Sequence, residues 1–335
     1  MPEAITSYLG VTPLRGEDGF TNTKRKILFL FEVTNYMIRI KYILAIMRAP
    51  FLLLPPVCVT LGISVAYWTQ GEVNLLYVLL ALVGAVASHI SVNVFNEYFD
   101  FKSGVDAQTQ KTPFSGGSGT LQAHPEMAGT ALATAVITLA ITALIGLYFT
   151  IVRGWALLIP GVLGLLIIYA YTPWITHYPL LCLLAPGLGF GTLWVLGTSF
   201  ALTGVYSWQA FLASLVPFFL VNNLLLLNQF PDVEADRNAG RRHYPIAIGR
   251  QASSYIYGLF VLLTYLSIIV GVILHYLPVT SLIGLGSLLF AVPAVRGAIR
   301  NANDIPKLIP ALGMNVFLNL STPLLMAIGL FIGKG

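Results

Sequence analysis

Long apolar runs, separated by short polar turns, dominate this chain. A helix that crosses a bilayer needs about 20 apolar residues, and nine runs are long enough. The predicted spans cover residues 43–69, 75–99, 127–151, 155–173, 179–203, 208–230, 252–275, 278–296 and 308–332. Most of them end at turns that contain glycine or proline. The pattern therefore predicts an all-helical protein that passes through a membrane nine times.

The first 41 residues follow a different pattern. Residues 1–23 are polar, whereas residues 24–41 mix basic and apolar side chains. That mixture fits either a helix that lies in the membrane interface or a simple linker. We therefore expect a tail over residues 1–41 and a transmembrane domain over residues 42–335.

Composition supports the membrane assignment and excludes several classes of protein. Of the 335 residues, 57% are hydrophobic and only 9% are charged. A soluble domain carries about 25% charged residues, so this chain is neither a soluble globular protein nor a disordered one. The net charge of +5 is not gathered into a basic recognition face, which argues against a nucleic-acid partner. Cys58 and Cys182 lie within apolar runs and fit buried small side chains better than a disulfide.

The basic residues are distributed unevenly between the two sides of the predicted bundle. Sixteen of the 18 lie before or early in the first span, or in the loops after the second, sixth and eighth spans. Only Arg153 and Lys334 fall on the other side. The positive-inside rule then predicts a cytoplasmic N-terminus, and these loops on the same face of the cell membrane.

Two acidic segments stand out because charged groups near membrane depth are costly. The first is NEYFDFKSGVD, residues 96–106, after the second span, and the other is NQFPDVEAD, residues 228–236, after the sixth. An offset of 132 residues relates Asn96 to Asn228 and Asp100 to Asp232, and it also relates two later pairs, a proline pair and a glycine pair. The chain therefore contains a parallel internal repeat of four helices, with both segments on the same side.

The spacing within each segment suggests a metal-dependent site. An Asn and an Asp four residues apart share one helix face, and Asp106 and Asp236 follow them. Facing carboxylates repel each other unless a cation lies between them. Carboxylate and amide oxygens suit Mg²⁺, particularly when a substrate adds phosphate oxygens. Four basic residues beside the acids fit a polyphosphate substrate: Lys102, Lys111, Arg241 and Arg242.

At these residues the sequence resembles the UbiA superfamily of intramembrane aromatic prenyltransferases. That family has paired NxxxD-type and DxxxD motifs and a nine-helix bundle around a lipid-accessible central cavity. The segments NEYFDFKSGVD, NQFPDVEADRNAGRR and, in part, residues 171–190 are most similar to its menaquinone branch. Two departures leave the acceptor open. Phe190 stands where the menaquinone branch usually has an acid, and the loop before the fifth span offers only His177 where the quinone-ring branch often has Lys or Arg.

The resemblance implies Mg²⁺-dependent transfer of a polyprenyl group from an allylic diphosphate to an aromatic acceptor. The expected acceptor is 1,4-dihydroxy-2-naphthoate, with 4-hydroxybenzoate as the alternative. Two Mg²⁺ ions would be held by six ligands, of which the four aspartates would be catalytic: Asn96, Asp100, Asp106, Asn228, Asp232 and Asp236. The diphosphate would be bound by the four basic residues beside the acids, joined by Arg48.

Several further residues have two interpretations. Tyr169 and Tyr171 either orient the acceptor or pack at the interface, and Asn93 either lines the cavity or bonds between helices. His243 either contacts a substrate or is an ordinary loop histidine, and the glycine-rich segment 112–119 is either a phosphate-binding turn or a flexible one. Two other functions remain open. A cation-coupled transporter is disfavoured because its site would lie near the midplane, and a silent relative is disfavoured by the complete acid set.

Overall fold

The computed structural model describes residues 26, 29–31, 33, 37, 39–105, 112 and 117–333. The chain divides into two compact units, Met1–Ala45 and Ile46–Gly335. The described residues of the first unit are helical. An interfacial role for residues 24–41 therefore stays a prediction. Of the predicted site residues, Asp106 and Lys111 lie outside the described residues.

The second unit is built from helices throughout its described residues. Eight are long and apolar enough to cross a membrane: Ala49–Gln70, Leu75–Ser103, Pro125–Arg153, Pro179–Thr203, Trp208–Asn238, Arg250–Ile273, Val279–Arg300 and Ile305–Ile332. A ninth apolar helix, Trp155–Ala170, is shorter. All nine predicted spans thus correspond to helical segments, and the fourth span is shorter than expected. The all-helical, multi-pass fold class is confirmed.

Polar caps and glycines set the helix ends where the sequence has turn signals. Helix α4 (Leu75–Ser103) begins where the Asn74 side chain accepts a hydrogen bond from the Tyr77 amide, and it ends at Gly104 in a left-handed conformation. Helix α10 (Trp208–Asn238) begins in the same way at Ser207, which caps the Ala210 amide. An oxygen-bearing side chain at the N-cap satisfies a backbone donor that would otherwise lack a partner.

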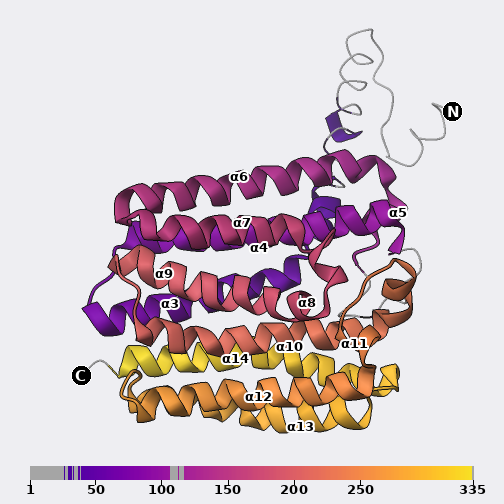
Figure 1. Ribbon diagram of the computed structural model, residues 1–335. Coiled ribbons are helices and arrows are strands. Elements are labelled where there is room, and N and C mark those ends of the chain that lie inside the picture. Colours follow the sequence, from indigo (N-terminus) through magenta and orange to yellow (C-terminus); the bar gives the residue numbers. More distant parts are fainter. Residues whose placement is uncertain are drawn as a thin grey trace, which may run out of the picture. The chain divides into compact units, whose positions relative to one another are not determined.

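The helices form a bundle in which α10 is the central element (Figure 1). Helix α10 packs against α3 (Leu54–Gln70), α9 (Trp194–Thr203), α12 (Arg250–Ile273) and α14 (Ile305–Ile332). Of the apolar stretch that makes α10 a candidate membrane span, 67% is buried inside the protein, a larger share than in any other candidate span of the described chain.

Helix α4 packs instead against α6 (Ala128–Arg153) and α7 (Leu158–Ala170). In the span that contains α6, only 22% of the apolar stretch is buried inside the protein, as expected for a helix whose outer face contacts lipid. The remaining span is formed by the segment η7 (Val279–Ser287) and α13 (Leu288–Arg300), and both pack on α14.

The fifth span is interrupted, and this interruption brings it close to α10. Helix α8 (Pro179–Pro186) ends at an internal proline and continues as the π-helical segment η6 (Gly187–Leu193) before α9 begins. A Cβ atom on Gly187 or Gly191 would collide with the α10 backbone at Phe218. The Gly187 amide also donates a hydrogen bond to Asn222 Oδ1. Phe190 of η6 and Trp194, the first residue of α9, line a cavity to which α10 also contributes.

Candidate active site

The two acidic segments occupy the ends of α4 and α10, and these ends lie at the same end of the bundle, here called the motif end. Asn96 and Asp100 belong to the last two turns of α4, whereas Asn228, Asp232 and Asp236 follow one another at four-residue intervals on α10. The spacing places each set on one helix face, as the sequence predicted. A direct side-chain connection between the two helices shows that the segments meet.

That connection is Arg241, which lies between one carboxylate from each segment. Its guanidinium donates hydrogen bonds to Asp100 Oδ1 and, at 2.7 Å, to Asp236 Oδ1. The second oxygen of Asp236 accepts a hydrogen bond from His243 Nε2 at 3.0 Å. Asp100, Asp236 and His243 are all buried. Arg241 therefore closes a cationic bridge, Asp100–Arg241–Asp236, across the 132-residue repeat.

Electrostatics keep this bridge charged. Burial by itself would lower the pKa of Arg241, but the carboxylates of Asp100 and Asp236 outweigh it and hold the pKa above its usual value. Arg241 is thus a permanent cation between two acids. His243 is buried, and its Nε2 contacts the Asp236 carboxylate, whereas a role in contacting a substrate stays a prediction.

A second chain of hydrogen bonds connects Arg48 to the same carboxylates. Arg48 has a left-handed backbone conformation (φ 54°) just before the first span. It donates from Nη2 to Asn96 Oδ1 at 3.0 Å. Asn96 in turn donates from Nδ2 to Asp100 Oδ2 at 3.0 Å and to Thr172 Oγ1 at 3.1 Å. Arg48, Asn96, Asp100, Arg241 and Asp236 therefore form one continuous network.

Glu97 is a member of this network that the sequence analysis did not single out. It is fully buried and accepts a hydrogen bond from Arg48 Nε at 2.8 Å. It also accepts hydrogen bonds from the Ser118 amide and hydroxyl, at 2.6 and 3.0 Å. Glu97 thus ties Arg48 to the end of the glycine-rich segment 112–119. The signal that could have identified it is its place within the acidic segment itself, directly after Asn96, where a charged group near membrane depth is costly.

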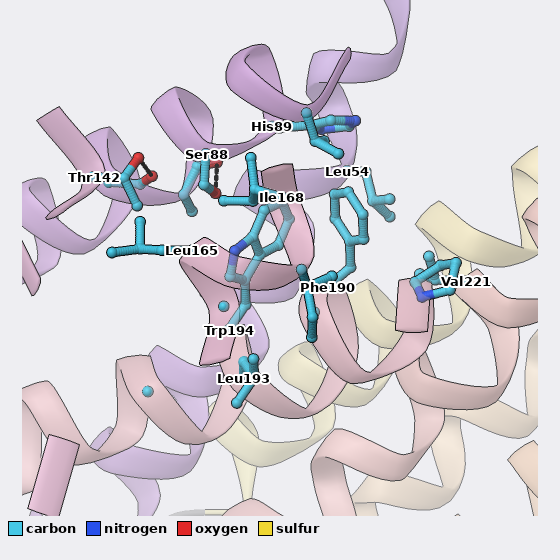
Figure 2. A pocket seen from close by; sticks show the side chains of 18 of the residues that line it. Leu54, Ser88, His89, Thr142, Leu165, Ile168, Phe190, Leu193, Trp194 and Val221 are labelled. Carbon is cyan, nitrogen blue, oxygen red and sulfur yellow. Dashed lines mark hydrogen bonds between the residues drawn. The ribbon is translucent and has the colours of Figure 1, made fainter. Parts of the chain in front are cut away.

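A cavity of about 410 Å³ begins at the motif end and runs through the apolar part of the bundle. Arg48, Asn96 and Asn228 line its polar end. Phe149 and Leu157 line it near the end of α6, where Arg153 stacks on Tyr77 at the start of α4. Most of the wall between is apolar, including Leu54, Leu165, Ile168, Phe190 and Trp194 (Figure 2). The site thus joins a charged end to a long channel with a mostly apolar wall.

The other candidate residues fall at different places. Tyr171 and Asn93 line the cavity, and Asn93 Nδ2 also donates to the Met47 carbonyl in the turn before the first span. Tyr169 is not part of the cavity wall; it is half-exposed and packs edge-on against Phe95 and Trp174. Lys102 and Arg242 are exposed at the motif end and contribute no described side-chain ion pair.

The residues present are suited to a hard divalent cation. Amide and carboxylate oxygens make up the whole donor set, which is the set that Mg²⁺ prefers. Asn228 Oδ1 is buried at the polar end of the cavity, and no described residue donates a hydrogen bond to it. Within the described part of the chain no three acids, cysteines or histidines already form a metal cluster, and Arg241 contacts both Asp100 and Asp236.

Comparison with known proteins gives a consistent result. The model of the UbiA prenyltransferase family matches residues 53–320. A 1,4-dihydroxy-2-naphthoate octaprenyltransferase of Bacillus subtilis (strain 168) is 31% identical over 184 residues, which cover 54% of this chain and 58% of that protein. A 2-carboxy-1,4-naphthoquinone phytyltransferase of Synechocystis sp. is 24% identical over 265 residues, with coverages of 76% and 81%.

Solved structures share the fold. A UbiA homolog from Aeropyrum pernix K1 superposes with a TM-score of 0.63 at 17% identity and covers 82% of this chain and 97% of its own. A UbiA homolog from Archaeoglobus fulgidus, bound to DMAPP and Mg²⁺, gives a TM-score of 0.54 at 15% identity, with coverages of 87% and 99%. At these identities the likeness concerns the fold.

The cationic bridge predicts a stability effect that is independent of catalysis. Arg241→Gln leaves two buried acids without their shared cation, and breaking a buried ion pair costs about 3 kcal/mol or more. We expect the melting temperature of detergent-solubilised protein in a chelator to fall by several degrees. Added Mg²⁺ should recover more of the loss in this variant than in the unchanged protein. Arg237→Gln is the matched control, because Arg237 pairs with Glu234 on an exposed face. Equal melting temperatures for the two variants would contradict the bridge.

Proposed function

Because this chain belongs to the UbiA prenyltransferase family, we propose that it transfers a polyprenyl group from an allylic diphosphate to an aromatic acceptor. The observation that carries the proposal is the junction of the two acidic segments at the mouth of a long apolar cavity. A diphosphate needs the charged end, and a polyprenyl chain needs the apolar channel. The lipid bilayer supplies the donor directly, which accounts for a membrane-embedded catalyst.

The donor site is proposed to hold two Mg²⁺ ions. Their ligands would be Asn96, Asp100, Asp106, Asn228, Asp232 and Asp236. When bound, the metal supplies neutralisation of the diphosphate leaving group. The chain's own cations add to this. Arg48 faces the cavity beside Asn96, and Arg241 lies among the acids, so both are placed to bind outer phosphate oxygens. The exposed Lys102 and Arg242 are assigned to draw the diphosphate towards the site.

In the proposed reaction the allylic C1–oxygen bond breaks and pyrophosphate leaves. The electron-rich ring of the acceptor then forms a bond to C1 and loses its proton. The apolar walls contribute by excluding water, which would otherwise capture the cationic C1. Tyr171 lines the cavity near this end and offers a ring face to the developing charge.

We propose 1,4-dihydroxy-2-naphthoate as the acceptor, which would place the enzyme in menaquinone biosynthesis. The names of the Bacillus and Synechocystis relatives, each a transferase acting on a naphthalene-type ring, support this assignment. Phe190 supports it too, because its ring forms part of the cavity wall together with Trp194. An apolar, aromatic wall favours a bicyclic ring over a smaller benzoate.

We also propose that the protein lies in the cell membrane with its N-terminus and motif end in the cytoplasm. The support is the uneven distribution of basic residues, most of which belong to this side.

The metal-binding assignment predicts that Asp100→Ala and Asp232→Ala each reduce turnover by at least about 10³-fold, since charge stabilisation at the leaving group is a large term. Both variants should still be inserted and give a cooperative melt. The measurement is Mg²⁺-dependent pyrophosphate release with a prenyl diphosphate and an acceptor. Glu234→Ala is the control: it is an exposed acid between two of the proposed ligands and should keep near-normal activity. Near-normal turnover of either aspartate variant at saturating Mg²⁺ would refute the assignment.

The orientation predicts which terminal labels are accessible. Ser7→Cys and Gly335→Cys should react with a membrane-impermeant maleimide from opposite faces, with Ser7→Cys reacting from the cytoplasmic one. The natural thiols, Cys58 and Cys182, are buried and should stay silent. Labelling of both introduced cysteines from one face would mean that an even number of helices crosses the membrane.

The acceptor assignment predicts selectivity between two acids. With one donor and purified enzyme, kcat/KM should be about tenfold or more higher for 1,4-dihydroxy-2-naphthoate than for 4-hydroxybenzoate, because the second ring buries more apolar area at about 25 cal/mol per Å². A competition assay measures the ratio directly. Faster transfer to 4-hydroxybenzoate, or transfer to neither acid, would leave only the donor half of the proposal.

A further inference from the structure

His89 is a polar side chain in the apolar part of the cavity. It lies on α4 seven residues before Asn96, so both residues share one helix face, with a rise of about 10 Å between them. Its side chain lines the cavity, and the residue is only 5% exposed. The reaction proposed above uses no group at this depth.

The ring nitrogen Nδ1 of His89 is buried, and no described residue hydrogen-bonds it. A buried polar atom without a partner is costly, by about 1–3 kcal/mol. Asn228 and Asn319 in the cavity wall also have a buried side-chain oxygen without a described donor, but the hydroxyl groups close to His89 are bonded within their own helices. Ser88, its neighbour, donates to the Ala85 carbonyl, and Thr142 donates to the Thr138 carbonyl. His89 is therefore ready to bond a group that enters the cavity.

Two aromatic side chains beside His89 indicate what kind of ligand carries the group that His89 would bond. The His89 ring meets the Phe190 ring edge-on, with centroids 4.8 Å apart, and lies 5.9 Å from the Trp194 ring. Figure 2 shows the three side chains reaching into the same part of the cavity. The close approach of η6 to α10 fixes the backbone that carries Phe190. A planar aromatic ligand with a polar substituent matches this combination of ring edges and one hydrogen-bonding nitrogen.

We propose that His89 is an acceptor-binding residue that hydrogen-bonds a ring hydroxyl of the aromatic acceptor, while Phe190 and Trp194 contact its faces and edges. The inference rests on the proposed prenyl transfer, and it assigns the position in the cavity at which the acceptor binds. With the diphosphate at Arg48 and Asn96, the reacting C1 lies between that end and His89. The rise of about 10 Å leaves room for C1 and one fused ring system. The hydrogen bond selects for a hydroxylated ring and turns it towards C1.

The test couples a change in the protein to a change in the acceptor. KM and kcat are measured for His89→Leu, His89→Gln and the unchanged enzyme, with 1,4-dihydroxy-2-naphthoate and with its two mono-methyl ethers. The unchanged enzyme should prefer the dihydroxy acid to one of the ethers by about tenfold, the value of one neutral hydrogen bond. His89→Leu should raise the acceptor KM by a similar factor and lose that preference. His89→Gln, which keeps a hydrogen-bonding group, should recover part of it.

The matched control is Ser88→Ala. Ser88 lines the same wall, but its hydroxyl is already bonded to its own helix, so its acceptor KM should stay unchanged. The KM for the prenyl diphosphate should be the same in all variants, and melting temperatures establish that they fold. If His89→Leu is unstable, the preference of the unchanged enzyme between the ethers and its partial loss in His89→Gln still decide the question.

Each result has a separate meaning. A changed donor KM or a changed preference for prenyl chain length, with the acceptor KM unaltered, would place the tail beside His89 and overturn the inference. An unchanged enzyme that shows no preference between the ethers, or a His89→Leu variant that keeps it, would do the same while leaving the transfer reaction intact. Failure of the unchanged enzyme to prenylate any aromatic acid would overturn the proposed function itself, and the inference with it.

Discussion

Repulsion between carboxylates from two different helices is the constraint on which the rest of the site depends. Asp100 and Asp236 belong to distant parts of the chain, yet each contacts the same guanidinium. In a partly buried site such charges are poorly screened, so they stay close only if a cation is shared between them. Arg241 supplies that cation from within the chain. The network that continues to Asn96 and Arg48 then sets where the polar end of the cavity lies.

The same constraint explains why the cavity is divided so sharply. Arg48, the charged side chain in the described cavity wall, lies at the motif end, where it is hydrogen-bonded to Asn96 and Glu97. The rest of the wall is apolar, and its few polar groups mostly bond their own helices, as Ser88 and Thr142 do. Charge stabilisation and water exclusion are therefore separated along one channel. A diphosphate with a long hydrocarbon tail has the same division along its own length.

The fold and the outline of the site could be predicted from the sequence because both follow from local patterns. Hydrophobic runs located the eight long apolar helices of the described chain and the shorter ninth, and the 132-residue offset placed Asp100 and Asp232 at equivalent positions. What could not be predicted depends on contacts between distant residues. The bridge joins Asp100 to Asp236 and not to its repeat equivalent Asp232, and this pairing depends on Arg241, which lies after the end of α10. The π-helical segment and its close approach to α10 also have no signature in hydrophobic spacing.

Glu97 illustrates why a motif is not the same as a ligand set. It lies next to Asn96 in an acidic segment, so its residue type alone would place it among the metal ligands. Both of its oxygens, however, are already engaged by Arg48 and Ser118, and it is completely buried. A carboxylate held in this way fixes the side chains of Arg48 and Ser118, while Asp100, one turn further along α4, contacts Arg241. The equivalent position in the second repeat is Gln229, whose side-chain amide donates to Cys182 Sγ and not to an arginine or a glycine-rich segment. The repeat thus preserves the side chains that face the shared site, while the residues that support them differ between its two halves.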